Sequence, residues 1–92
     1  MNKYSVKPLP SDIQSALAER FRKLRKAEGY SQAEMAQRSG VSLGSLKRFE
    51  LTGQISLESL LKLAYLLDRL DDFMKVFEPG VDMKRIEKLF NS

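Results

Sequence analysis

Apolar residues recur every three or four positions along most of the chain, which is the spacing of an amphipathic α-helix. No stretch alternates apolar and polar residues over the length of a strand, and no Asn-Gly or Asp-Gly hairpin pair occurs. The pattern therefore predicts an all-α fold.

The first three predicted helices are separated by glycines and begin at serines. The first follows Ser11, whose hydroxyl would form a capping box with Gln14, and it ends at Gly29. The second follows Ser31 and ends at Gly40. The third follows Ser42 and ends at the break over residues 52–54. We expect the apolar face of the first helix to consist of Ile13, Leu17, Phe21 and Leu24.

Three further helices are predicted in the second half of the chain. The fourth follows Ser56 and is apolar on nearly all sides, with Leu57, Leu60, Leu61, Ala64 and Leu67 expected to be buried. The fifth covers about 70–77, with Leu70, Phe73, Met74 and Phe77 facing inward. A sixth, short helix in the segment "VDMKRIEKLF" places Met83, Ile86, Leu89 and Phe90 on one side.

The breaks divide the chain into an extended arm at 1–10, where Pro8 and Pro10 disfavour helix, a helical domain at 11–78, and a helical extension at 79–92 after Pro79-Gly80.

Composition narrows the function. The 92 residues include no cysteine and no histidine, which removes thiolate nucleophiles, the commonest zinc ligands and the commonest general base, so we expect no enzyme, metal or cofactor. No signal peptide or membrane-spanning stretch is expected, which favours a cytoplasmic protein. Residues 1–50 carry a net charge of +5 and residues 51–92 a net charge of −1. The basic half suggests a polyanionic partner.

The second and third helices have the spacing of a helix-turn-helix. Ala36 is small where the two helices would cross, and Gly40, four residues later, permits the tight turn. Val41, Leu46 and Phe49 would then point inward, while the outward face of the third helix carries four polar residues: Ser42, Ser45, Lys47 and Arg48. This arrangement predicts DNA binding through the third helix; an all-helical module without that function is the alternative.

The segment from Phe21 to Leu67, and "SQAEMAQRSGVS" in particular, resembles the Cro/cI-type (XRE) helix-turn-helix family. The resemblance covers roughly residues 12–77. It implies a compact five-helix, lambda-repressor-like domain, here with one additional C-terminal helix, that binds double-stranded operator DNA as a homodimer. It also implies that the third helix enters the major groove.

Carried over by position, the resemblance assigns Gln32 to a phosphate contact and Ser42, Leu43, Gly44, Lys47 and Arg48 to the DNA-facing surface, with Ser45 as a lesser candidate beside them. It further implies that Arg25 and Glu50 form a buried ion pair beneath the reading helix. Leu43 and Gly44 depart from the polar residues that are usual in the family. Arg48 is then the main candidate for base recognition, with a phosphate contact or readout of DNA shape as the alternatives.

The part after the third helix resembles HipB-type antitoxins, which repress their own operon and bind a HipA-type kinase toxin. The sequence thus favours a transcriptional repressor that is also the antitoxin of a toxin-antitoxin module. A free-standing XRE-type regulator without a toxin partner is the alternative, and RNA binding is disfavoured because exposed aromatic clusters are lacking. The expected dimer or partner interface consists of Leu70, Phe73, Phe77, Met83, Ile86, Leu89 and Phe90.

Overall fold

The computed structural model describes residues 7–80. In this range the chain forms four α-helices and one short 3-10 helix, and it forms no strand. They are α1 (Pro10–Ala27), α2 (Gln32–Ser39), α3 (Leu43–Thr52), α4 (Leu57–Leu66) and η1 (Leu70–Phe73). The predicted all-α class is confirmed, whereas the predicted five-helix count is not met in the described residues.

Serine caps begin three of the four helices, as the sequence predicts. The hydroxyls of Ser31, Ser42 and Ser56 accept hydrogen bonds from the backbone N–H groups three residues later. Each such cap satisfies an N–H group that has no partner within the helix and contributes about 1 kcal/mol. The starts of α2, α3 and α4 are therefore determined by local sequence.

The predicted start of α1 at Ser11 is wrong. The helix begins at Pro10, with Leu9 as its extended cap residue, and the N–H of Leu9 donates to the Asp12 carboxylate at 2.8 Å. A proline suits the first helical position because its missing N–H would have no helical partner there. Pro10 is therefore the first residue of α1, and not part of the extended arm that the sequence predicts.

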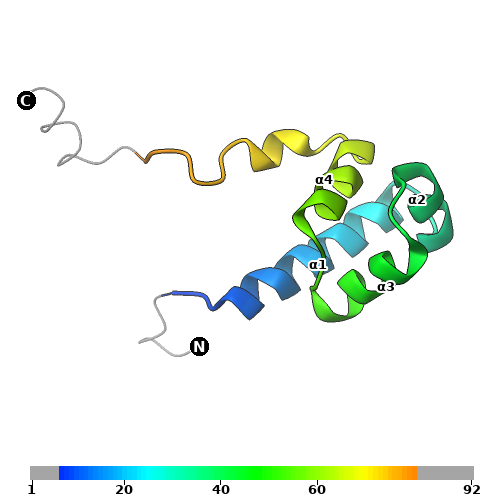
Figure 1. Cartoon of the computed structure of the whole chain (residues 1–92), viewed down its shortest axis with the longest axis horizontal. Coiled ribbons are helices and arrows are strands. Elements are labelled where there is room, and N and C mark those ends of the chain that lie inside the picture. Colours follow the sequence, from blue (N-terminus) through cyan, green and yellow to red (C-terminus); the bar gives the residue numbers. More distant parts are fainter. Residues whose placement is uncertain (1–6, 81–92) are drawn as a thin grey trace, which may run out of the picture.

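The core lies where all four helices meet. Met35, Leu46, Phe49 and Leu63, from α2, α3 and α4, are the largest fully buried side chains. From α1, Phe21 packs against Phe49 with ring centroids 5.5 Å apart. Figure 1 shows α2 and α3 side by side next to the long α1. The motif and the helix beneath it thus share one core.

The burial predicted for α4 is only partly correct. Leu63, Ala64 and Leu67 are buried, but Leu57 is 67% exposed. Ile13 on α1, at 47% exposed, also departs from its predicted inward position. Both residues lie in the first turns of their helices, where few neighbours surround them.

The predicted fifth helix over 70–77 with an inward apolar face is wrong. Only Leu70–Phe73 forms a helical turn, and Leu70, Met74 and Phe77 are exposed, Phe77 completely. Residues 74–80 run away from the other helices (Figure 1). A short helix is marginal in water unless its apolar face packs on another element, and within residues 7–80 the exposed side chains of Met74 and Phe77 meet no such surface.

The predicted sixth helix, with Met83, Ile86, Leu89 and Phe90, lies outside the described residues.

Candidate nucleic-acid interface

The turn between α2 and α3 depends on Gly40. Its backbone is left-handed, with φ 81°, and its N–H donates to the carbonyl of Ala36 at 3.0 Å. The next residue, Val41, is buried and donates its N–H to the Ser39 hydroxyl at 3.1 Å. Glycine adopts this conformation without steric cost, so α3 can start directly after the turn. The helix-turn-helix geometry predicted from the sequence is thus present.

The two sides of α3 differ sharply in exposure. Leu46 and Phe49 are 0% and 1% exposed, whereas all five residues predicted from the third helix to face DNA are exposed: Leu43, Gly44, Ser45, Lys47 and Arg48. Neither Lys47 nor Arg48 is ion-paired with an acid in the described part of the chain. The outer face of α3 is consequently cationic, with the exposed leucines Leu43 and Leu51 at its two ends.

Ser42 and Ser45 form a small hydroxyl cluster at the start of α3. The Ser42 hydroxyl accepts from the Ser45 N–H at 3.1 Å and donates to the Ser45 hydroxyl at 2.8 Å. The hydroxyl proton of Ser42 and one of its lone pairs are therefore used within the first turn of α3. Ser45 keeps its own hydroxyl proton for another acceptor.

The space beside the Cα atom of Gly44 is empty. A Cβ added at this position would meet no atom within 4 Å, and the residue has ordinary helical geometry. Nothing inside the described fold therefore requires glycine here. A glycine at the exposed start of α3 lets an external surface approach the helix backbone closely.

Beneath this face lies the buried pair that the resemblance implies. The Nε of Arg25 donates to Glu50 Oε2 at 2.7 Å and its Nη2 to Oε1 at 3.0 Å, and the two side chains are 7% and 6% exposed. The Nη1 of Arg25 donates to the carbonyl of Tyr30 at 2.8 Å. The bidentate pair therefore ties α3 to α1 and to the loop before α2.

Gln32 connects this network to the surface. Its side-chain Nε2 donates to Glu50 Oε1 at 3.1 Å, and the residue is half-buried at the start of α2. No buried polar side-chain atom among residues 7–80 lacks a hydrogen-bond partner. The Gln32 amide is thus partly used within the protein, and its second N–H remains for an outside acceptor.

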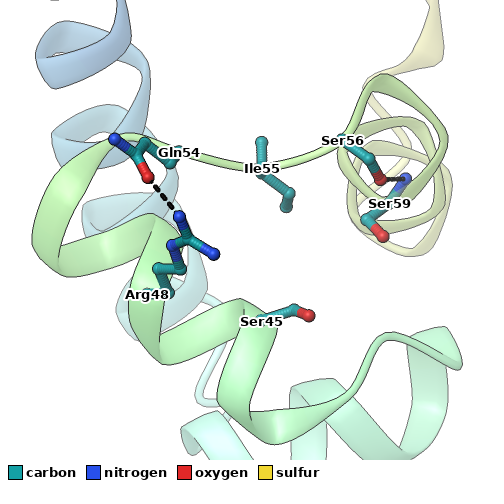
Figure 2. A pocket seen from close by; sticks show the side chains of 6 residues that line it. All are labelled: Ser45, Arg48, Gln54, Ile55, Ser56 and Ser59. Carbon is teal, nitrogen blue, oxygen red and sulfur yellow. Dashed lines mark hydrogen bonds between the residues drawn. The ribbon is translucent and has the colours of Figure 1, made fainter.

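The structure adds Gln54, a residue that the sequence analysis did not single out. Gln54 Oε1 accepts from Arg48 Nη2 at 2.5 Å across the break after α3. Both side chains line an open hollow of about 280 Å³, together with Ser45, Ile55, Ser56 and Ser59. Figure 2 shows how these six side chains lie around it. The separation of six residues matches no helical period, so periodicity could not reveal this pair.

Of the seven predicted interface residues, the structure describes three, and these differ in exposure. Leu70 is 39% exposed, Phe73 is half-buried and Phe77 is fully exposed with φ 61°. Leu70 also borders a second, mostly apolar hollow of about 500 Å³ between α2 and α4, together with Leu61, Tyr65 and Leu66. Met83, Ile86, Leu89 and Phe90 are outside the described residues.

Two further kinds of feature are absent from residues 7–80. No helix there is long and apolar enough to cross a bilayer. No group of three or more histidine, cysteine or acidic residues in that range has the geometry to hold a metal ion.

Comparison with known proteins bears on the motif. A family model described as "Helix-turn-helix" matches residues 21–72, which is more than half of the chain. No curated protein and no solved structure gives a significant match. The matched range contains the buried Arg25–Glu50 pair, the turn at Gly40 and the exposed face of α3. On this basis the chain belongs to the XRE-type helix-turn-helix family of DNA-binding transcription regulators.

Proposed function

We propose that the chain is a repressor that binds operator DNA as a homodimer. The observation that carries the proposal is the exposed face of α3, whose cations lack acidic partners among the described residues and whose orientation is fixed from below by Arg25 and Glu50. Such a face can enter the major groove while the core stays intact. The protein would act at operator DNA in the cytoplasm.

Individual residues have distinct proposed roles. Gln32 donates its remaining N–H to a phosphate at the start of α2. Leu43 contacts a thymine methyl group, and Gly44 admits the DNA close to the helix. Lys47 and Ser45 contact the groove or its edge, and Arg48 reads a base. Ser42 shares this surface but acts mainly as the helix cap.

Dimerisation follows from the small size of one reading helix. A single helix-turn-helix reads too few base pairs for a specific operator, and two-fold dimers place two such helices about one DNA turn apart, roughly 34 Å. Leu70, Phe73 and Phe77 are our candidates for the two-fold interface. The exposure of Leu70 and Phe77 among the described residues supports this choice, whereas Phe73 is half-buried.

The test is selection of duplexes from a randomised DNA library by the purified protein. We expect an enriched inverted repeat whose half-sites are centred about 10 base pairs apart. Arg48→Ala should weaken binding to this duplex and relax the preference at one position in each half-site. Lys23→Ala is the control, because Lys23 is an exposed cation on α1 that pairs with Glu19. Failure to enrich any sequence would contradict sequence-specific repression.

We further propose that the repressor is the antitoxin of a HipBA-like module with a kinase-like toxin as partner. The resemblance after α3 supports this, as does the exposed apolar segment that contains Met74, Val76 and Phe77. Co-purification of the neighbouring gene product from native expression is the test. Deleting residues 81–92 should reduce its capture while leaving operator affinity within about tenfold. If no partner co-purifies, the free-standing regulator replaces the antitoxin.

A further inference from the structure

The loop that follows α3 is unusually well fixed for an exposed connection. Gly53 is left-handed at φ 80° and donates its N–H to the carbonyl of Phe49 at 2.8 Å. A Cβ at Gly53 would stand 2.9 Å from the backbone of Gln14, so the loop packs directly on α1. The backbone next to Gln54 is thereby held against two helices.

Three linked hydrogen bonds then connect this loop back to α3. The Thr52 hydroxyl donates to the carbonyl of Arg48 at 2.7 Å and accepts from the N–H of Gln54 at 3.1 Å. The Gln54 side chain closes the ring by accepting from Arg48 Nη2. Figure 2 shows the guanidinium aimed at Gln54 rather than extended freely into solvent.

From this geometry we infer that Gln54 is a positioning residue for DNA recognition, which holds the Arg48 guanidinium in one orientation before DNA binds. The inference rests on the proposed function, because it concerns how Arg48 reads the operator. Arginine has five N–H donors, and Gln54 occupies one of them. Four remain, enough for a bidentate contact with the O6 and N7 of a guanine.

The choice of a neutral acceptor is consistent with this role. A carboxylate at position 54 would hold Arg48 equally well but would cancel its charge next to the phosphates. The amide of Gln54 fixes the cation, leaves its charge in place and keeps two N–H donors of its own. Because the Arg48 side chain is already ordered before DNA binds, it loses less conformational entropy on binding.

The experiment is a double-mutant cycle on the duplex that the wild-type protein selects from a random library. Gln54→Ala should weaken binding about three- to tenfold, the range expected for one arginine that must be ordered on binding. The same change made in Arg48→Ala protein should have no effect. Gln37→Ala, an exposed glutamine on α2, is the matched control.

Gln54→Glu separates orientation from charge. It keeps the acceptor, so we expect the base preference at the Arg48 position to be retained. It should nevertheless weaken binding to all duplexes and lower the salt slope by about one charge. A second measurement needs no DNA: ¹⁵N relaxation of Arg48 Nε should report an ordered side chain in the wild type and a mobile one in Gln54→Ala.

The outcomes are distinguishable. If Gln54→Ala lowers DNA affinity equally in the presence and absence of Arg48, the inference is overturned and the DNA-binding function still stands. An Arg48 Nε that is equally mobile in the wild type and in Gln54→Ala would have the same consequence. Failure of the wild-type protein to select any duplex would overturn the proposed function and this inference with it.

Discussion

The exposed side chains of α3 and those of residues 57–80 differ in chemistry. On α3, Lys47, Arg48 and Ser45 face solvent and the large apolar side chains Leu46 and Phe49 are buried. Along α4 and the segment after it, solvent-facing positions include Leu57, Tyr65, Met74, Val76 and Phe77.

This difference separates a surface with exposed cations from one with several exposed apolar side chains. The α3 surface carries the polar side chains Ser45, Lys47 and Arg48 over a buried core, with Leu43 and Leu51 as its exposed apolar residues. Exposed apolar surface is typical of regions that associate with another protein, and Met74, Val76 and Phe77 supply it within four consecutive positions. We therefore interpret the first surface as the one for DNA and the second as the one for a second copy or a partner.

The largest expected effect comes from breaking the support of the α3 surface. Glu50→Ala leaves Arg25 as a buried charge without its acid, which should lower the free energy of unfolding by about 3–5 kcal/mol. Urea denaturation measures this. Glu19→Ala, which removes an exposed acid paired with Lys23 on α1, should change stability by less than about 0.5 kcal/mol. A similarly small effect for Glu50→Ala would contradict a structural role for the pair.

The next largest effect concerns Gly53. In Gly53→Ala, a residue with a left-handed backbone must also place a Cβ against the Gln14 backbone. We therefore expect the free energy of unfolding to fall by about 2–4 kcal/mol. Gly40→Ala is a matched control, because Gly40 has nearly the same φ but open space around it. Gly40→Ala should lower the free energy of unfolding only by the cost of holding an alanine in a left-handed backbone conformation, about 1–2 kcal/mol. Equal losses in the two variants by thermal unfolding would argue against tight packing of the loop on α1.

The third prediction tests the apolar surface. Phe77 is fully exposed, so Phe77→Ala should leave the unfolding of the monomer unchanged. If a second copy covers this residue, the change should weaken self-association by about 1–2 kcal/mol, or roughly 5- to 30-fold. Sedimentation equilibrium measures the association constant, with Leu51→Ala as a control at an exposed leucine on α3. A wild-type protein that is monomeric at micromolar concentration would leave this surface to a different partner.

The smallest expected effect concerns Gly44, at the exposed start of α3. Gly44 lies in a helix and has open space where a Cβ would stand. Gly44→Ala should therefore raise the free energy of unfolding by about 0.5–1 kcal/mol. If DNA approaches the helix backbone at this point, the same change should weaken operator binding by about 1 kcal/mol, or fivefold. Thermal unfolding and fluorescence anisotropy would give the two values. A gain in stability with unchanged binding would mean that the glycine has no role in recognition.

The sequence by itself determined the elements whose causes are local. The caps at Ser31, Ser42 and Ser56 and the turn at Gly40 depend on hydrogen bonds and backbone preferences within a few residues, and the structure contains all of them. The helical period also separated Leu46 and Phe49 from Lys47 and Arg48, because side chains on one helix are sorted by its geometry alone.

Only the tertiary structure decided the features that join distant parts of the chain. Periodicity assigned Phe77 and Leu57 to the core because it reports which residues share a face and not whether that face meets another element. The contact of Gly53 with Gln14 and the hydrogen bond from Arg48 to Gln54 depend on where the chain turns back after α3. Such contacts are set by the packing of α3 and its loop on α1, which no local pattern encodes.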